Sequence, residues 1–150
     1  MDIGHDYHFT HCLSSIGSRS GVVTSVRFLG SIAQKDVSRE LARATVVAAP
    51  FLKSAMTSEH TSPLKAFEAM AAGRPLLISD TDASREIVED GRTGIVVPPG
   101  NVEAWASALE RVLSDRPLQL TLARAAFEKA TQYSWARRAE RIEDFLGGLA

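Results

Sequence analysis

The chain has 150 residues, of which 45% are hydrophobic and 23% charged, and its formal net charge is -1. This balance excludes the strongly basic surface of nucleic-acid-binding domains, and the length fits one domain with a buried core. The single cysteine, Cys12, excludes an intrachain disulfide and fits a reducing compartment. Neither an apolar run of roughly 20 residues nor a signal peptide is recognisable, so we expect a cytoplasmic protein.

Residues 1–21 show no periodic pattern and are predicted to form a flexible leader. His5, Asp6, His8 and His11 include imidazoles at a spacing of three, which a helix would place on one face, and zinc sites use such ligands. The segment has neither a helix cap nor an apolar stripe that would preorganise these side chains. We therefore expect no metal and no cofactor.

Ordered structure is predicted from Val22 onward. The segments 22–29 and 45–49 are apolar and have the length of strands. The segment LLIS, residues 76–79, is a third such run and follows a helical segment, which is typical of a buried parallel strand. The fold class predicted from these alternating segments is α/β.

The segment 61–80, TSPLKAFEAMAAGRPLLISD, specifies a helix with both ends defined. Ser62 is a favourable N-cap residue, and Pro63 fits the first helical position, where its missing N–H costs nothing. The residues that follow contain no glycine or β-branched side chain. Gly73 supplies a left-handed stop, and Pro75 cannot continue the helix. A ten-residue helix from Pro63 is therefore predicted.

The start of this helix is a candidate anion site. The first N–H groups of a helix lack internal acceptors and lie at the positive end of its dipole, so Leu64 and Lys65 can direct donors at a pyrophosphate. Glu68 lies on the same side, one turn further along. Its carboxylate suits two vicinal hydroxyls of a ribose. The alternative is a solvated Glu68 that only pairs with Lys65.

The remaining segments predict further helices and one strand. Asp82 is predicted to cap a helix ending near Glu89, and residues 93–97 to form a strand. Asn101 is predicted to cap a helix through Leu113 that buries Trp105. Two closing helices are expected over 118–131 and 134–146.

The central segment resembles the signature of family 4 glycosyltransferases with the GT-B fold. In that signature two acidic residues are separated by seven others, and the second opens a Glu-Ala-Met-Ala-x-Gly-x-Pro run, which here is residues 68–75. The resemblance extends from about residue 26 to residue 144. It implies a Rossmann-like parallel sheet with flanking helices, as an incomplete GT-B C-terminal domain over residues 22–150.

The resemblance also implies roles for individual residues. A nucleoside-diphosphate sugar is the expected partner, and its sugar is expected to be transferred with retention of configuration. Glu68 would hold the ribose, the amides at Ser62 and Leu64 the diphosphate, and Ser31 and Ile32 the edge of the base.

Two positions depart from the family signature. His60 occupies the first acidic position and is our candidate catalytic residue, since it can still exchange one hydrogen bond with the donor sugar; alternatively it is an exposed loop histidine. Pro63 replaces a common glycine and removes one donor from the phosphate cradle. Lys65 can add a compensating positive charge.

Parts of a complete GT-B enzyme are not recognisable in the chain. The acceptor-binding domain is missing, as are the first two strands of the donor domain, which would lie between the strands at 22–29 and 45–49. The exposed sheet edges favour association, so we expect part of a longer polypeptide or a chain of low stability.

Two other functions fit the sequence. One is a catalytically silent Rossmann-like remnant that associates with a partner. The other is a flavodoxin-like or receiver-like interaction domain, in which Asp80 at the end of a strand is the functional residue. The second lacks a clustered acidic pocket and a well-placed lysine.

Overall fold

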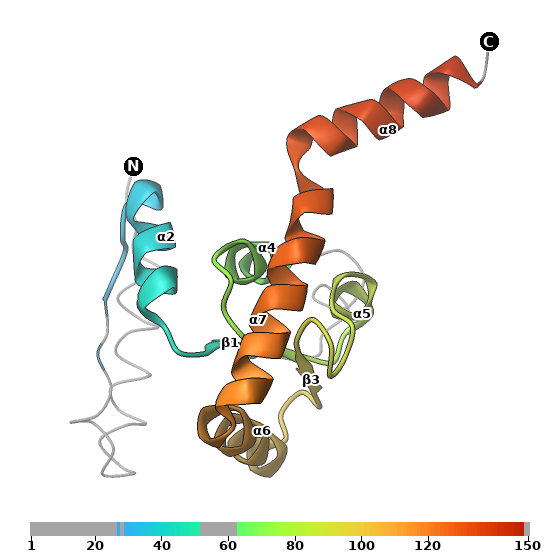
Figure 1. Cartoon of the computed structure of the whole chain (residues 1–150). Coiled ribbons are helices and arrows are strands. Elements are labelled where there is room, and N and C mark those ends of the chain that lie inside the picture. The colour runs from blue at the N-terminus through green and yellow to red at the C-terminus, as the bar shows by residue number, and fades with distance from the viewer. Residues whose placement is uncertain (1–26, 28, 52–62, 149–150) are drawn as a thin grey trace. The chain divides into compact units, whose positions relative to one another are not determined.

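The computed structural model describes residues 27, 29–51 and 63–148 (Figure 1). The chain divides into two compact units, residues 1–37 and 38–150. The sheet and the helices that cover it belong to the second unit. The predicted leader lies outside the described residues, so its boundary stays a prediction.

A parallel sheet of three strands forms the centre of the second unit, in the order β1-β2-β3. The strands are β1 (Val47–Ala49), β2 (Leu76–Ser79) and β3 (Ile95–Val97). All four residues of β2 are buried, as expected for the middle strand of a sheet covered on both faces. The predicted buried parallel strand is confirmed, and so is the α/β class.

Six α-helices and a short 3-10 helix are present among the described residues. Four of these helix starts carry side-chain caps, at Thr81, Asn101, Asp115 and Ser134. The bounds are α2 (Gln34–Arg43), α4 (Leu64–Ala71), α5 (Asp82–Ile87), α6 (Val102–Ser114), α7 (Arg116–Ala130), the 3-10 helix η2 (Thr131–Tyr133) and α8 (Trp135–Gly147).

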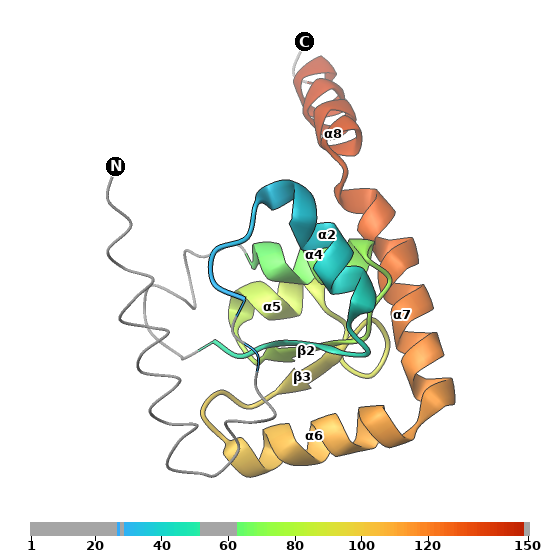
Figure 2. The same ribbon diagram turned by 90° about the vertical axis from the view of Figure 1, so that its left-hand side faces the viewer.

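The core has two layers because side chains of β2 alternate between the faces of the sheet. Leu76 and Ile78 pack in a cluster with buried residues of α4 and α5, whereas Leu77 packs in a second cluster with α6. Figure 2 shows α4 and α5 on one side of the sheet and α6 on the other. α7 joins the layers, since Leu122 belongs to one cluster and Ala126 to the other.

Several predicted boundaries need correction. Thr81, not Asp82, caps α5, because the Thr81 hydroxyl accepts from the Ser84 N–H at 3.2 Å, and the helix ends at Ile87. Trp105 is only half-buried, although it packs against the second core cluster as predicted. Within the predicted strand 22–29, only two residues are described and neither is in a strand.

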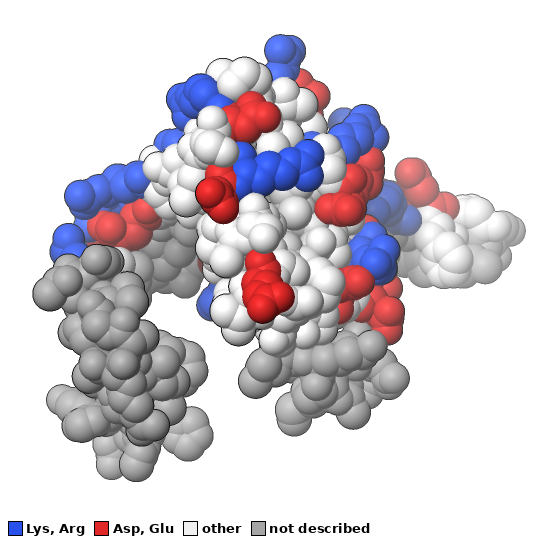
Figure 3. Space-filling model, turned by 90° about the horizontal axis from the view of Figure 1, so that it is seen from below, with Lys and Arg blue, Asp and Glu red and all other residues white. Residues whose placement is uncertain are grey.

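Charged side chains of both signs are interspersed on the face seen in Figure 3. This distribution agrees with the net charge of -1. The view therefore shows no continuous basic surface of the kind that binds nucleic acids.

An ion-pair cluster ties the loop after α5 to α7. Glu89 Oε1 lies 2.7 Å from Lys129 Nζ, and Glu89 Oε2 lies 2.6 Å from Arg92 Nη1. Hydrogen bonds from Lys129 and then from Arg92 hold the pKa of Glu89 below its usual value of 4.5. Lys129 is largely enclosed, with 18% of its side chain exposed.

This cluster makes the stability of the domain sensitive to acid. A carboxylate whose pKa is lowered on folding stabilises the native state above its ordinary pKa, and that contribution is lost as the pH falls through the lowered value. Glu89→Gln is expected to lower the free energy of unfolding at pH 7 and to weaken its dependence on pH below 4.5. Urea denaturation between pH 7 and pH 3 measures both. Glu103→Gln, an exposed residue of α6, is the control, and equal pH profiles for the two variants would contradict the prediction.

Candidate functional site

The candidate site lies at the carboxyl edge of the sheet. β1 ends at Ala49 and β2 at Ser79, and because the strands are parallel both ends meet the same edge. α4 connects these strands, so it starts at the carboxyl edge and runs back toward their amino ends. Ligands of open α/β sheets bind at the carboxyl edge. The N-terminus of α4 is thus in the place where a ligand is expected.

Pro63 forms the N-terminal cap of α4, one residue later than predicted. Its backbone angles, φ -77° and ψ 73°, are not helical, so the helix begins at Leu64 and not at Pro63. Among the described residues no side chain caps this end, and Ser62 lies outside them. The Pro63 ring is buried, and its carbonyl accepts from the Ala66 N–H at 2.8 Å.

Two backbone donors remain open at this end. The N–H groups of Leu64 and Lys65 have no acceptor within the part of the chain that the structure describes. Both residues are exposed, and the Leu64 side chain is 68% exposed. Open first-turn amides at the positive end of a helix dipole favour an anion. The two amides are therefore candidate ligands for an anion.

The rotation of α4 about its axis is fixed by its buried face. Ala66, Ala69 and Met70 are fully buried against the sheet. The Phe67 ring contacts Tyr133 edge-on, with ring centroids 4.9 Å apart. Glu68, half-buried, follows Leu64 by one turn, on the same side of the helix as the open amides.

The C-terminus of α4 is closed as the sequence predicts. Gly73 has φ +61°, the left-handed conformation that favours glycine. The Gly73 N–H donates to the Met70 carbonyl at 3.0 Å, and the Arg74 N–H to the Ala69 carbonyl at 3.1 Å. These two bonds form a Schellman motif, which turns the chain directly into β2. The helix has eight residues instead of ten.

The other predicted site residues belong to the first compact unit or lie outside the described residues. Ser31 and Ile32 are exposed and belong to the first compact unit, residues 1–37. His60 lies outside the described residues, as does Ser62. Of the predicted set, Leu64, Lys65 and Glu68 lie on α4 and Pro63 is its N-cap residue, and the remainder stays a prediction.

An ion pair that we did not predict lies at the same edge of the sheet. The Asp80 carboxylate accepts two hydrogen bonds from Arg85, from Nε at 2.6 Å and from Nη2 at 2.7 Å. The hydrogen bond to Asp80 and its charge raise the pKa of Arg85. Asp80 follows β2, so its place was predictable, but a partner five residues away does not follow from helical spacing. The cation bound to Asp80 is therefore an arginine, whereas the receiver-like alternative calls for a lysine.

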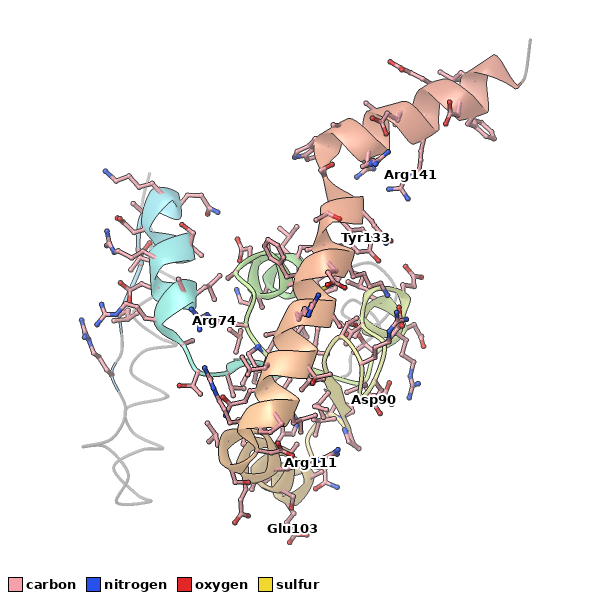
Figure 4. All side chains as sticks on the ribbon, viewed as in Figure 1. Arg74, Asp90, Glu103, Arg111, Tyr133 and Arg141 are labelled. Carbon is pink, nitrogen blue, oxygen red and sulfur yellow. The ribbon has the colours of Figure 1, made fainter. Side chains whose placement is uncertain are left out.

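An apolar groove of about 380 Å³ adjoins the start of α4. Figure 4 shows Tyr133 where α7 leads into α8, and Arg141 on α8. The Arg138 guanidinium lies 5.6 Å from the centroid of the Trp135 ring, within cation–π range. The residues lining the groove are Leu64, Phe67, Tyr133, Trp135, Arg138 and Arg141.

The described residues contain neither a metal-binding cluster nor a membrane-spanning helix. No group of three or more His, Cys, Asp or Glu side chains is placed to hold a metal ion within residues 27, 29–51 and 63–148. In the same ranges, none of the helices combines the length and the apolar character that crossing a membrane requires.

Known protein families and individual proteins match most of this chain. Residues 8–115 match the model described as glycosyl transferases group 1. A D-inositol 3-phosphate glycosyltransferase of Corynebacterium aurimucosum is 32% identical over 124 residues, which cover 83% of this chain and 28% of that protein. A phosphatidyl-myo-inositol mannosyltransferase of Mycobacterium leprae is 33% identical over 122 residues, which cover 81% of this chain and 31% of that protein.

Solved structures share the fold. The Anabaena protein HepE, crystallised with UDP and glucose, superposes with a TM-score of 0.82 at 24% identity, covering 95% of this chain and 37% of that one. The C-terminal domain of a group 1 glycosyl transferase from Francisella tularensis superposes with a TM-score of 0.70 at 24% identity, covering 87% of this chain and 64% of that one.

The chain covers only part of each of these relatives. The chain spans about 30% of the length of the curated relatives above. The family match extends over more than half of this chain and includes the run from Glu68 to Pro75. The chain therefore belongs to the glycosyl transferases group 1 family, as a C-terminal GT-B domain.

Proposed function

We propose that this chain is the donor-binding part of a glycosyltransferase and holds a nucleoside-diphosphate sugar at the N-terminus of α4. The observation that carries the proposal is the pair of open N–H groups at Leu64 and Lys65, with the Glu68 carboxylate one turn further along the same side. An anionic diphosphate and a ribose diol are chemically complementary to these groups. Membership of the family supports the same ligand class.

Each residue of the proposed site has a separate role. The amides of Leu64 and Lys65 bind the diphosphate, and the exposed Lys65 side chain adds a positive charge. Pro63 presents the helix end without an N–H of its own, and the proposed role of the Ser62 amide is to donate to the diphosphate together with Leu64. Glu68 accepts hydrogen bonds from the ribose hydroxyls.

The remaining predicted residues act outside α4. His60 contacts the donor sugar as the candidate catalytic residue. Ser31 and Ile32 border the base. The proposed chemistry needs no protein base to break the bond between sugar and diphosphate, because helix amides and cations stabilise the departing diphosphate electrostatically.

The printed names of related proteins support the donor class. HepE structures contain UDP or UDP-glucose. A Mycobacterium tuberculosis mannosyltransferase, 29% identical to this chain, is named as GDP-mannose-dependent. We therefore propose a UDP, GDP or ADP sugar as donor, and the acceptor is not specified by the residues of this chain.

We further propose that a partner acceptor domain covers α8. Trp135 is 82% exposed, Ile142 51% and Phe145 68%, and their spacing places them along one side of the helix. Exposed apolar side chains in such a row are typical of an interface. The exposed Ala48 on the outer strand β1 is a second place of association. Cytoplasmic location stays a prediction.

The proposed interface is tested through Trp135. With Trp105→Phe as background, acrylamide quenching reports on Trp135 alone, since the chain has two tryptophans. Joining an acceptor domain to the chain is expected to protect Trp135 from the quencher. Unchanged quenching in the joined protein would exclude α8 as the interface.

A catalytically silent binding domain is the second candidate function. It is favoured by the histidine at position 60, where the signature has an acid. A neutral imidazole carries no fixed negative charge near the donor sugar. Such a protein would bind nucleotide without transferring sugar.

Calorimetric titration of the full chain with UDP, GDP and ADP tests the proposal. One of the three is expected to bind, and the corresponding nucleoside without phosphates to bind at least about tenfold more weakly, because the helix amides lose their anion. The absence of binding by all three nucleotides would reject the proposed function. Binding without sugar transfer in the joined enzyme would favour the silent domain.

A further inference from the structure

A buried hydroxyl, that of Ser79, binds the backbone where the chain leaves β1. Ser79, the last residue of β2, is 0% exposed, and its Oγ accepts from the Phe51 N–H at 2.7 Å. Phe51 lies two residues after the end of β1. This bond joins the carboxyl ends of the two strands between which α4 is inserted.

The bond replaces a regular rung of the sheet. Val47 donates to the Pro75 carbonyl at 2.9 Å, and the register then pairs Ala49 with Ile78. The backbone N–H groups of alternate residues point at the neighbouring strand, so the next donor directed at β2 after Ala49 is that of Phe51. Its N–H bonds to the side chain of Ser79. The chain thus leaves the sheet while its backbone donor remains paired.

The side chain of Phe51 and the buried face of α4 belong to the same part of the core. Phe51 packs against the core cluster that contains Ala66, Ala69 and Met70, the buried face of α4. The same face sets the rotation of the helix and so the direction of the Leu64 amide. A shift of Phe51 would therefore displace the packing on which the helix N-terminus rests.

We infer that Ser79 is a positioning residue of the donor site, which acts through Phe51 to hold the N-terminus of α4 in its anion-binding orientation. The inference rests on the proposed function. It assigns no contact between Ser79 and the ligand. The Ser79 hydroxyl accepts the hydrogen bond of Phe51, the residue at which the chain leaves β1 toward α4.

The test compares two buried hydroxyls that make the same kind of bond at opposite edges of the sheet. Thr93 is 2% exposed, and its Oγ1 accepts from the Glu89 N–H at 2.9 Å just before β3. Ser79→Ala and Thr93→Val each remove one such acceptor. Ser79→Thr keeps the hydroxyl and serves as the rescue variant.

Nucleotide affinity is measured for the full chain and the three variants. Ser79→Ala is expected to raise the Kd about tenfold, Thr93→Val to leave it within about twofold, and Ser79→Thr to restore it. Wild-type affinity in Ser79→Ala, or an equal loss in Thr93→Val, would overturn the inference while leaving the proposed function intact.

Amide hydrogen exchange gives a readout that needs no nucleotide. In Ser79→Ala the Phe51 amide is expected to exchange at least about tenfold faster, with faster exchange in the first turn of α4, whereas Thr93→Val leaves both unchanged. Unchanged exchange at Phe51 and α4 in Ser79→Ala would overturn the inference. Failure of all nucleotides to bind the wild type would reject the proposed function, and this inference with it.

Discussion

Gly94→Ala is expected to lower the free energy of unfolding by about 3 kcal/mol, the cost of overpacking a closed core position. A Cβ at this position would lie 2.8 Å from Val88 Cγ1 and 3.0 Å from the Leu76 carbonyl oxygen. Val88 is 2% exposed and Leu76 is 0% exposed, so neither has room to move. The clash would separate β3 from the middle strand, against which the buried face of α4 packs.

Gly91→Ala is the matched control for this prediction. Gly91 lies in the same turn and has φ +72°, but a Cβ there meets nothing within 4 Å. Its substitution therefore costs only backbone strain, about 1 kcal/mol. Urea denaturation measures both variants. If Gly94→Ala unfolds at the same urea concentration as Gly91→Ala, the close approach of Gly94 to β2 does not destabilise the variant and the prediction is wrong.

Glu68→Gln is expected to weaken nucleotide binding about 30-fold. The substitution keeps the size of the side chain but removes a charged acceptor for two ribose hydroxyls, and hydrogen bonds to charged groups contribute about 1.5–3 kcal/mol. Glu110→Gln, an exposed residue on α6, controls for the loss of one negative charge. Isothermal titration gives the Kd of each variant.

A 2′-deoxynucleotide separates ribose binding from a general effect on α4. If Glu68 contacts the ribose, the deoxy analogue binds the wild type about tenfold more weakly, and Glu68→Gln discriminates less between the two ligands. If the substitution and the missing 2′-hydroxyl each lower the affinity by the same factor whether or not the other change is present, Glu68 does not contact this hydroxyl. Because the two ligands are compared within each variant, a small change in the stability of the variant affects both Kd values equally.

Local chemistry made the helix at the candidate site predictable. Gly73 and Pro75 mark its end, and the structure places the left-handed turn at Gly73. The start was wrong by one residue, because a proline can serve either as the cap or as the first helical residue, and only the backbone angles of Pro63 distinguish these states.

Contacts between distant segments were not predictable from the sequence. Lys129 and Glu89 are 40 positions apart, and Ser79 and Phe51 are 28 apart. Neither pair follows a helical or strand period, so only the folded chain brings them together. The family resemblance supplied the ligand class, whereas the sequence pattern alone gave an anion site without an identified ligand.

The amide chemical shifts of Leu64 and Lys65 during a nucleotide titration test the central claim most directly. We expect the largest changes in the 15N–1H spectrum to occur at these two amides and to depend on the diphosphate, because their open N–H groups are the proposed anion ligands. Saturable binding with the largest changes at another part of the chain, and none at Leu64 and Lys65, would contradict it.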